Sequence, residues 1–337
     1  MGRKKMIAAG ILIAAILTVS VLVINIKNNN KTQPEFVLSY AENQTPNYPT
    51  TLGAEYFAQL VEEQTDGRIK IAVYSEAQLG SEKEVIKQMQ FGGIDFARLS
   101  LSQLAEFEPE LNVLQMPYLY NDSQHMWKVL ESSIGDDFLD VISDCDLIGM
   151  SWYDAGARNF YNSVRPIEKL EDMSGLRIRV QESELMADMV KALGAQPFQI
   201  AYSDVYSAIE RGIVDGAENN WPSYETMQHY MVAEYFTVDE HARVPEVQVC
   251  SAHTWSKLSE SDREIIIQCA RKSAVYEREL WQKQEEESKN IALSHGVKVI
   301  ELSKEEKQRF RQAVMSVYEK YCKDYMDVLN EIIQMGD

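Results

Sequence analysis

The chain has 337 residues, and its 52 acidic against 33 basic residues give a formal net charge of −19 at pH 7. Hydrophobic residues make up 45% and charged residues 25%, as in a folded globular protein, and the length suits two lobes of about 150 residues each. The negative charge excludes nucleic acid and an anionic membrane surface as partners. An anionic small molecule could still bind in a locally positive cleft.

Residues 1–26 are predicted to be an export signal or membrane anchor, followed by a linker at 27–34. Three basic residues (3–5) precede an uninterrupted apolar run at 6–23, which approaches the ~20 residues of a bilayer crossing. No small-x-small cleavage site follows, so we expect the segment to stay as an anchor, with cleavage within "AAILTVS" as the alternative. In both cases the protein is expected to work outside the cytoplasm, in the periplasm or on the outer face of the membrane.

The chain from 35 to 153 has a β-α-β-α-β order. Its predicted strands are 35–40, 68–74, 94–99 and 147–154, and its predicted helices are 50–67, 81–91 and 132–146. Ser81 is expected to cap the second helix, with Glu84 completing a capping box. This order predicts a parallel sheet with right-handed crossovers, and we assign 35–153 mainly to a first lobe.

The chain from 154 to 245 is assigned mainly to a second lobe, with a strand at 176–180 and helices at 182–195 and 203–212. Ser203 is expected to cap the last of these helices and Gly212 to end it. Residues 246–337 are expected to supply a crossing strand and C-terminal helices that brace both lobes. Their predicted helices are 259–296 and 304–334, each continuous; a coiled-coil partner surface is the alternative, although no sustained heptad supports it.

The segments "VIKQMQFGGIDFARLS" and "VYSAIERGIVDGAENN" share one plan: a helix, a glycine stop, an apolar step and an aspartate. In each segment the polar residues after the aspartate fall at the end of a short strand. Ligands of open α/β sheets bind beyond the carboxyl ends of strands. The shared plan therefore points to residues 96–100 and 217–221 as two sides of one crevice.

Sequence motifs of catalysis are absent: there is no GxSxG, HExxH, GxGxxG or glycine-rich phosphate loop. The five histidines lack metal-ligand spacing, and the carboxylates are distributed over helix faces. We therefore expect a protein that is not an enzyme and that uses no metal or cofactor. The four cysteines (145, 250, 269 and 322) are far apart, and we expect buried free thiols rather than the disulfides that export would permit.

Arginines in apolar or aromatic surroundings are the strongest indication of a ligand. "MSGLRIRVQES" places Arg177 and Arg179 on one face of a strand, and "SWYDAGARNFYNS" places Arg158 among aromatic residues. A guanidinium binds a carboxylate through two parallel hydrogen bonds. In "DGAENNWPSYE", amide side chains lie beside aromatic rings. Amides can donate hydrogen bonds to hydroxyls and accept them from hydroxyls, and aromatic rings can pack against the apolar face of a sugar. The structural alternative is that each arginine pairs with one of the many Asp and Glu residues.

The chain resembles the solute-binding subunit of TRAP (tripartite ATP-independent periplasmic) transporters, the DctP-like family. The stretches that carry the resemblance are "YSEAQLGSEKEVIKQMQFGGIDF", "ARNFYNSVRPI", "EDMSGLRIRV" and "VYSAIERGIVDGAENN". The resemblance covers nearly the whole exported portion. It implies an α/β, two-lobe periplasmic-binding-protein-like fold (type II-like), with central mixed sheets and a long lobe-spanning helix, closing over one ligand.

By position, Arg179 matches the family arginine that binds the substrate carboxylate. Arg158 and Asn219 match two further family positions, and Arg177 is expected to meet Glu171 or Asp172. The likeness to uronate-binding members adds contacts to sugar hydroxyls. The full set of expected substrate-binding residues is Arg179, Arg158, Asn219, Glu218, Arg98, Glu82, Ser81, Tyr48, Asn220 and His241. The segment "AENQTPNYPT" (41–50) departs from the family pattern, since it lacks the usual histidine before the proline.

The resemblance implies a monomeric extracytoplasmic receptor for a hexuronate, such as D-glucuronate or D-galacturonate. It would deliver this ligand to the small and large membrane subunits of a TRAP transporter. Two alternatives stay open. One is a receptor for another carboxylate (an aldonate, a dicarboxylate or a sialate-like acid), and the other is an extracellular sugar-acid lyase.

Overall fold

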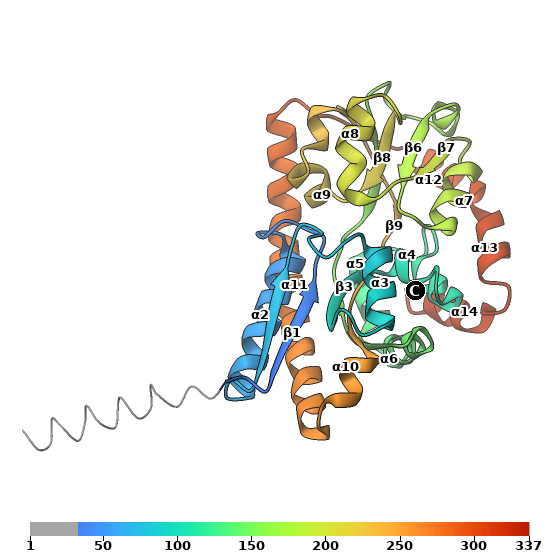
Figure 1. Ribbon diagram of the computed structural model, residues 1–337. Coiled ribbons are helices and arrows are strands. Elements are labelled where there is room, and N and C mark those ends of the chain that lie inside the picture. The colour runs from blue at the N-terminus through green and yellow to red at the C-terminus, as the bar shows by residue number, and fades with distance from the viewer. Residues whose placement is uncertain (1–32, 337) are drawn as a thin grey trace, which may run out of the picture.

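A computed structural model describes residues 33–336, so the predicted export signal or anchor lies outside the described residues. Within the described range, no helix combines the length and the apolar character that a bilayer crossing requires. The chain forms two β-sheets covered by helices. One long helix runs beside both sheets, on the left in Figure 1.

The first sheet has the strand order β2-β1-β3-β10-β4. Its strands are β1 (Phe36–Ala41), β2 (Ile69–Tyr74), β3 (Phe96–Ser100), β4 (Leu147–Tyr153) and β10 (Glu246–Ser251). The strand β1 pairs in parallel with β2 and with β3, as the β-α-β-α-β order predicts. The late strand β10 lies antiparallel between β3 and β4, which makes the sheet mixed.

The second sheet has the strand order β11-β9-β5-β8-β6-β7. Its strands are β5 (Arg158–Asn162), β6 (Arg177–Val180), β7 (Gln196–Gln199), β8 (Gly216–Asn219), β9 (Tyr235–Ala242) and β11 (Lys298–Glu301). The strand β6 pairs in parallel with β7 and β8, whereas β5 runs antiparallel to β8 and β9. The chain passes from one sheet to the other through short segments at 154–157 and 243–245, and again through the long segment 252–297 between β10 and β11.

The helices on the first-sheet side are α2 (Pro49–Gln64), α3 (Glu82–Gln90), α4 (Leu101–Leu104), α5 (Ser123–Leu130), α6 (Ser133–Val141) and α10 (Ala252–Lys257). On the second-sheet side they are α7 (Glu184–Ala192), α8 (Val205–Glu210) and α9 (Trp221–Thr226). The capping box predicted for α3 is present, with the backbone N–H of Ser81 donating to Glu84 at 2.9 Å. The predicted cap of α8 is wrong: Ser203 lies in a 3₁₀ turn (Tyr202–Asp204), and Asp204 holds the N-cap position.

The C-terminal part contains α11 (Glu260–Ser294), α12 (Lys304–Ala313), α13 (Met315–Tyr321) and α14 (Met326–Gln334). The predicted long helix is confirmed by α11, which is 35 residues long. The predicted continuous helix at 304–334 is wrong, because the chain turns at Val314 and again after Tyr321. The turns bring Phe310, Val317 and Ile332 into the core, and a straight helix would leave part of this set exposed.

The helix α11 contributes to the apolar packing beneath both sheets. Its first half places Ile266 and Cys269 in the cluster around Phe57 of α2, and near its end Ala292 joins the cluster of the second sheet. Trp281 lies between these two contacts and packs with Tyr48. The predicted lobe-spanning helix is therefore present as a physical brace.

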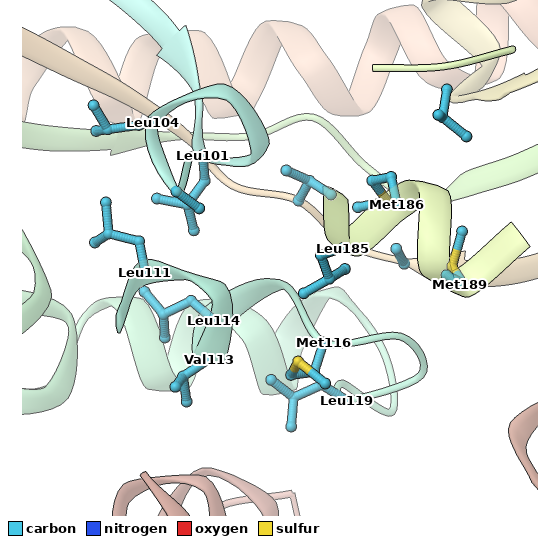
Figure 2. Close-up of a cluster of buried hydrophobic side chains, with 14 of the residues drawn as sticks. Leu101, Leu104, Leu111, Val113, Leu114, Met116, Leu119, Leu185, Met186 and Met189 are labelled. Atoms are coloured by element: carbon cyan, nitrogen blue, oxygen red, sulfur yellow. The ribbon is translucent and has the colours of Figure 1, made fainter. Parts of the chain in front are cut away.

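The largest apolar cluster joins α7, which follows strand β6 of the second sheet, to the N-terminal helices. Figure 2 shows Leu185 of α7 directed toward the turn that carries Leu114 and Met116. Leu101 of α4 belongs to the same cluster. All four cysteines are buried and free, as predicted. Burial raises the pKa of the Cys145 and Cys322 thiols to about 12, which keeps them protonated and unreactive.

Candidate ligand-binding cavity

A cavity lined by side chains from both sides of the molecule lies between the two sheets. Its wall on the first-sheet side includes Asn43, Gln44, Tyr48, Thr50, Ser81, Glu82, Arg98, Gln103 and Glu246. Its wall on the second-sheet side includes Arg158, Arg179, Gln181, Glu182, Tyr202, Ser203, Asn219, Asn220 and Ser223, and α11 adds Trp281. The cavity meets the carboxyl ends of β1, β6 and β8, where an α/β fold is expected to bind its ligand.

Arg179 is a buried cation without a counter-ion. Only 2% of the residue is exposed, its Nε donates to the carbonyl of Ile200 at 2.8 Å, and its Nη1 has no hydrogen-bond partner. It makes no ion pair with any residue from 33 to 336. Burial lowers the pKa of this guanidinium, with partial opposition from Glu218. A buried charge is costly unless it is paired, so this side chain is prepared for an anion.

Arg158, at the start of β5, is by contrast fully paired. Its Nη2 donates to Oε1 of Glu218 at 2.9 Å and to the Glu218 carbonyl at 3.0 Å, and its Nε donates to Oε2 of the same carboxylate. Burial opposes ionisation of Glu218, but the attraction of Arg158 and His241 prevails and lowers the pKa of this carboxyl to about 2. The charges of this pair cancel, and Arg158 is the member that lines the cavity.

His241, the penultimate residue of β9, supports this pair from behind. Its Nδ1 lies 3.0 Å from Asp239 and its Nε2 lies 3.4 Å from Glu218, while its ring stacks on Phe160 with centroids 4.2 Å apart. Burial disfavours the imidazolium, yet the two carboxylates raise the pKa of His241 to about 9. His241 and Glu218 do not line the cavity. Glu218 holds Arg158, and His241 in turn holds Glu218.

Two asparagines lie at the cavity, Asn219 as the last residue of β8 and Asn220 directly after it. Their side-chain amides differ in the hydrogen bonds that they make within the protein. Asn220 caps α9: its Oδ1 accepts from the Ser223 N–H at 2.7 Å, and its Nδ2 donates to the Ala155 carbonyl at 3.0 Å. Asn219 accepts only from the Asn220 N–H, at 2.9 Å, and no hydrogen bond of its Nδ2 is present among the described residues. Asn219 thus keeps donor capacity for the cavity, whereas the amide of Asn220 is occupied within the protein.

Arg98 of β3 lies on the opposite wall among three glutamates. It donates to Glu42 at 3.1 Å, to Glu82 at 3.1 Å and to Glu246 at 2.7 Å, and it also contacts Asn43. Glu82 additionally accepts from the Ser100 N–H at 2.9 Å. The Ser81 side chain binds Glu84, although Ser81 itself lines the cavity.

Contacts across the cavity hold its two walls together. The hydroxyl of Tyr48, at the start of α2, lies 2.9 Å from Ser223 of α9, and Nε2 of Gln181 donates to Ser100 at 3.0 Å. Despite these contacts, several buried polar atoms of the lining residues find no hydrogen-bond partner within residues 33–336: Gln44 Oε1, Thr50 Oγ1, Arg179 Nη1, Gln181 Oε1, Tyr202 OH and Trp281 Nε1. Buried polar atoms are normally hydrogen-bonded, so their gathering around one cavity indicates a polar ligand.

The chain matches the family model of bacterial extracellular solute-binding proteins, family 7 (DctP), over residues 40–324. The chain belongs to this family. A TRAP periplasmic solute-binding protein from Bradyrhizobium sp. BTAi1, in complex with galacturonate, is 35% identical with a TM-score of 0.85, covering 88% of this chain and 98% of that chain. A protein from Pseudomonas putida F1 with bound D-glucuronate is 34% identical with a TM-score of 0.85, covering 88% and 96%. The sugar acid-binding protein DctPAm from Advenella mimigardefordensis, in complex with galactonate, is 26% identical with a TM-score of 0.86, covering 91% and 99%.

In this DctP-family protein, eight of the ten predicted binding residues line the cavity; Glu218 and His241 lie behind it. The predicted partner of Arg177 is wrong. Arg177 pairs with Asp215, with Nη2–Oδ1 at 2.6 Å, because the parallel neighbours β6 and β8 bring them together. Glu171 instead pairs with Arg309, and Asp172 accepts from the Lys169 N–H.

Sequence reasoning missed several cavity residues of the DctP-family protein. Gln181 could have been found, since it follows Arg179 by two positions and therefore shares its face of the strand. Glu246 and Trp281 gave no local signal, because they come from a strand and a helix far along the chain. Within the divergent segment 41–50, Tyr48 lines the cavity as expected, whereas Asn47 is exposed and outside the lining.

Proposed function

We propose that this protein captures a hexuronate, such as D-glucuronate or D-galacturonate, in the cavity between the two sheets. The observation that carries this proposal is Arg179, a buried guanidinium on a cavity wall that pairs with no carboxylate in the described part of the chain. A carboxylate there would complete two charge-assisted hydrogen bonds. The uronates bound by the Bradyrhizobium and Pseudomonas neighbours support this class of ligand.

The ligand hydroxyls would meet the remaining polar groups of the cavity. Asn219 offers donor capacity, while Gln44 and Gln181 offer buried acceptor oxygens without partners. Trp281 presents an aromatic surface from α11. These groups suit a sugar acid better than a short apolar carboxylate, which would leave them unsatisfied.

Capture would proceed by closure of two lobes. We assign 35–153 mainly to the first lobe, 154–245 mainly to the second, and 246–337 to the parts that brace both. The paired crossings at 154–157 and 243–245 suit a hinge. Small-angle scattering is expected to show a smaller radius of gyration with D-glucuronate than without it.

The family places the protein outside the cytoplasm. We propose further that the apolar segment at 6–23 is retained as an anchor and that the loaded receptor delivers its ligand to the small and large membrane subunits of a TRAP transporter. N-terminal sequencing of the native protein tests the anchor. A mature chain that starts after residue 20 would contradict retention.

The ligand is tested by calorimetry with D-glucuronate, D-galacturonate, D-galactonate and succinate. We expect a uronate to bind with micromolar or tighter affinity, about −8 kcal/mol or better. A response to succinate without any response to uronates would overturn the proposal. The galactonate bound by the Advenella neighbour makes an aldonate the second candidate. Mass spectrometry of the incubated sugar acids would reveal an unsaturated product if the protein were a lyase.

A further inference from the structure

The buried charges on the two walls of the cavity differ. On the second-sheet side Arg158 pairs with Glu218, the buried Arg179 makes no ion pair with any residue from 33 to 336, and the half-buried Glu182 adds one carboxylate to the lining. This side can hold one carboxylate. The opposite side has the reverse imbalance among its buried charges.

On the first-sheet side, three carboxylates contact one guanidinium. The side chains of Glu42, Glu82 and Glu246 are at most 11% exposed and all pair with Arg98, so three ionised carboxylates and one cation would leave a net charge of −2. Burial raises the pKa of Glu246 to about 7 against the attraction of Arg98, and it also raises the pKa of Glu82. We call these four residues the Arg98 cluster. Above about pH 7, where Glu246 is ionised, this cluster has more negative charge than its one arginine can compensate, and at any pH it has more acceptor oxygens than this arginine can satisfy.

We propose that the Arg98 cluster makes the cavity selective for sugar acids with a single carboxylate. It would accept hydroxyl hydrogens from the end of the ligand that lies away from Arg179, and it would repel a second carboxylate at that end. This inference rests on the proposed function, because Arg179 must hold the first carboxylate.

The physical basis is the difference between a hydroxyl and a carboxylate as a neighbour of Glu82 and Glu246. A hydroxyl donates a hydrogen bond to a carboxylate, whereas a second carboxylate brings only acceptors and a negative charge. With an effective dielectric constant of about 20, two unit charges about 6 Å apart repel enough to weaken binding about 100-fold. The unpartnered acceptors Gln44 Oε1 and Gln181 Oε1 reinforce the preference for donors.

The test compares galactarate with D-galactonate, two open six-carbon sugar acids that differ in having a carboxylate or a hydroxymethyl group at carbon 6. D-galacturonate is measured beside them. We expect the wild-type protein to bind the tighter of the two monocarboxylates at least ~100-fold more tightly than galactarate by calorimetry. The measurements are made at about pH 8.5, where Glu246 with its pKa of about 7 is ionised, so Glu246→Gln keeps the shape and removes one negative charge, and this ratio should fall at least ~10-fold.

Two further variants complete the design. Glu82→Gln removes a second charge of the Arg98 cluster, should lower the ratio in the same direction, and replaces Glu246→Gln if that variant does not fold. Glu279→Gln removes an exposed charge from α11 and should leave the ratio unchanged.

The possible results separate this inference from the proposed function. If a monocarboxylate binds but galactarate binds equally well, or if the ratio does not change in the variants, the selectivity role is wrong and the proposed function stands. If the wild-type protein binds galactarate or succinate but no monocarboxylate, or binds none of these acids, both are wrong.

Discussion

Arg98 and Arg179 lie on opposite walls of one cavity and are almost equally buried, at 3% and 2% exposure. Arg98 contacts three carboxylates, whereas among residues 33–336 the Arg179 side chain donates only to the carbonyl of Ile200. Burial is therefore the same and the charge environment is opposite. The comparison shows that burial alone does not distinguish an arginine that is paired within the protein from the one that we propose to bind the ligand; the neighbouring carboxylates do.

The largest effect on stability is expected when the Arg98 cluster loses its cation. Arg98→Met would leave Glu42, Glu82 and Glu246 buried together without compensation. Breaking a buried ion pair by removing one partner costs about 3–5 kcal/mol, so urea unfolding should show a loss of this size.

Arg177→Met is the matched control for this variant. The Arg177 side chain is 38% exposed in its pair with Asp215, and such a pair contributes at most about 1 kcal/mol. Equal losses in the two variants would contradict a central structural role for Arg98.

For Arg179 the expected loss is in binding rather than in folding. Arg179→Ala should abolish measurable uronate binding, because a buried charged contact is worth about 2–5 kcal/mol. Arg179→Lys should weaken binding at least ~10-fold, about 1.4 kcal/mol, because lysine keeps the charge and loses the two-pronged hydrogen bond. The stability of the unliganded protein should hold or rise slightly, since an uncompensated cation is removed.

Calorimetry and thermal unfolding of the same preparations measure both effects. Arg177→Ala should leave uronate binding nearly unchanged. The reverse order, with Arg177→Ala losing the ligand and Arg179→Ala keeping it, would show that the cleft faces the other side of β6.

Local patterns in the sequence were sufficient to predict most helices and strands. Of the two arginines compared above, they were sufficient for Arg179. The capping box at Ser81, the 35-residue α11 and the parallel core of the first sheet follow from residues close together in the chain. Arg179 was also found, because strand alternation and the family resemblance both single it out. These features depend on short-range geometry, which a single sequence expresses directly.

Long-range pairings could not be predicted in this way. Arg98 and Glu246 are 148 positions apart and meet only because β10 inserts beside β3. Arg177 meets Asp215, 38 positions away, because β6 and β8 are neighbours in the sheet. The sequence thus shows which residues are charged, while the topology determines which charges remain uncompensated.

A smaller effect concerns pH and the wall behind Arg158. The carboxylates of Asp239 and Glu218 raise the pKa of His241 from about 6.5 to about 9 against the effect of burial. The folded state therefore holds this proton more tightly, and the resulting stability is complete below about pH 6.5 and is lost as pH rises through about 9. Between about pH 7 and 8.5, the unfolding free energy of the wild-type protein should fall with pH.

In His241→Gln this slope should decrease by the equivalent of about one proton, as measured by urea unfolding at several pH values. His229→Gln is the control. Burial lowers the pKa of His229 to about 3, so it stays neutral across this range and its loss should leave the slope unchanged. An unchanged slope in His241→Gln would mean that His241 is not the cation between Asp239 and Glu218.

The smallest expected effect concerns the contact that joins the two walls. The Tyr48 hydroxyl lies 2.9 Å from Ser223 and 3.4 Å from Oδ1 of Asn220, so Tyr48→Phe removes one short hydrogen bond and one long one across the cavity and leaves the ring on Trp281. A hydrogen bond of this kind contributes about 1 kcal/mol, which corresponds to about a fivefold weaker uronate affinity, expressed mainly as faster dissociation. Tyr120→Phe is a matched control, because it also removes one buried hydrogen bond, to the Leu114 carbonyl at 2.9 Å, but within one side of the molecule. Thermal unfolding should register a loss in both variants, whereas stopped-flow dissociation should change only in Tyr48→Phe. If dissociation speeds up equally in both, the contact between Tyr48 and Ser223 supports the fold in general and does not hold the cavity closed over its ligand.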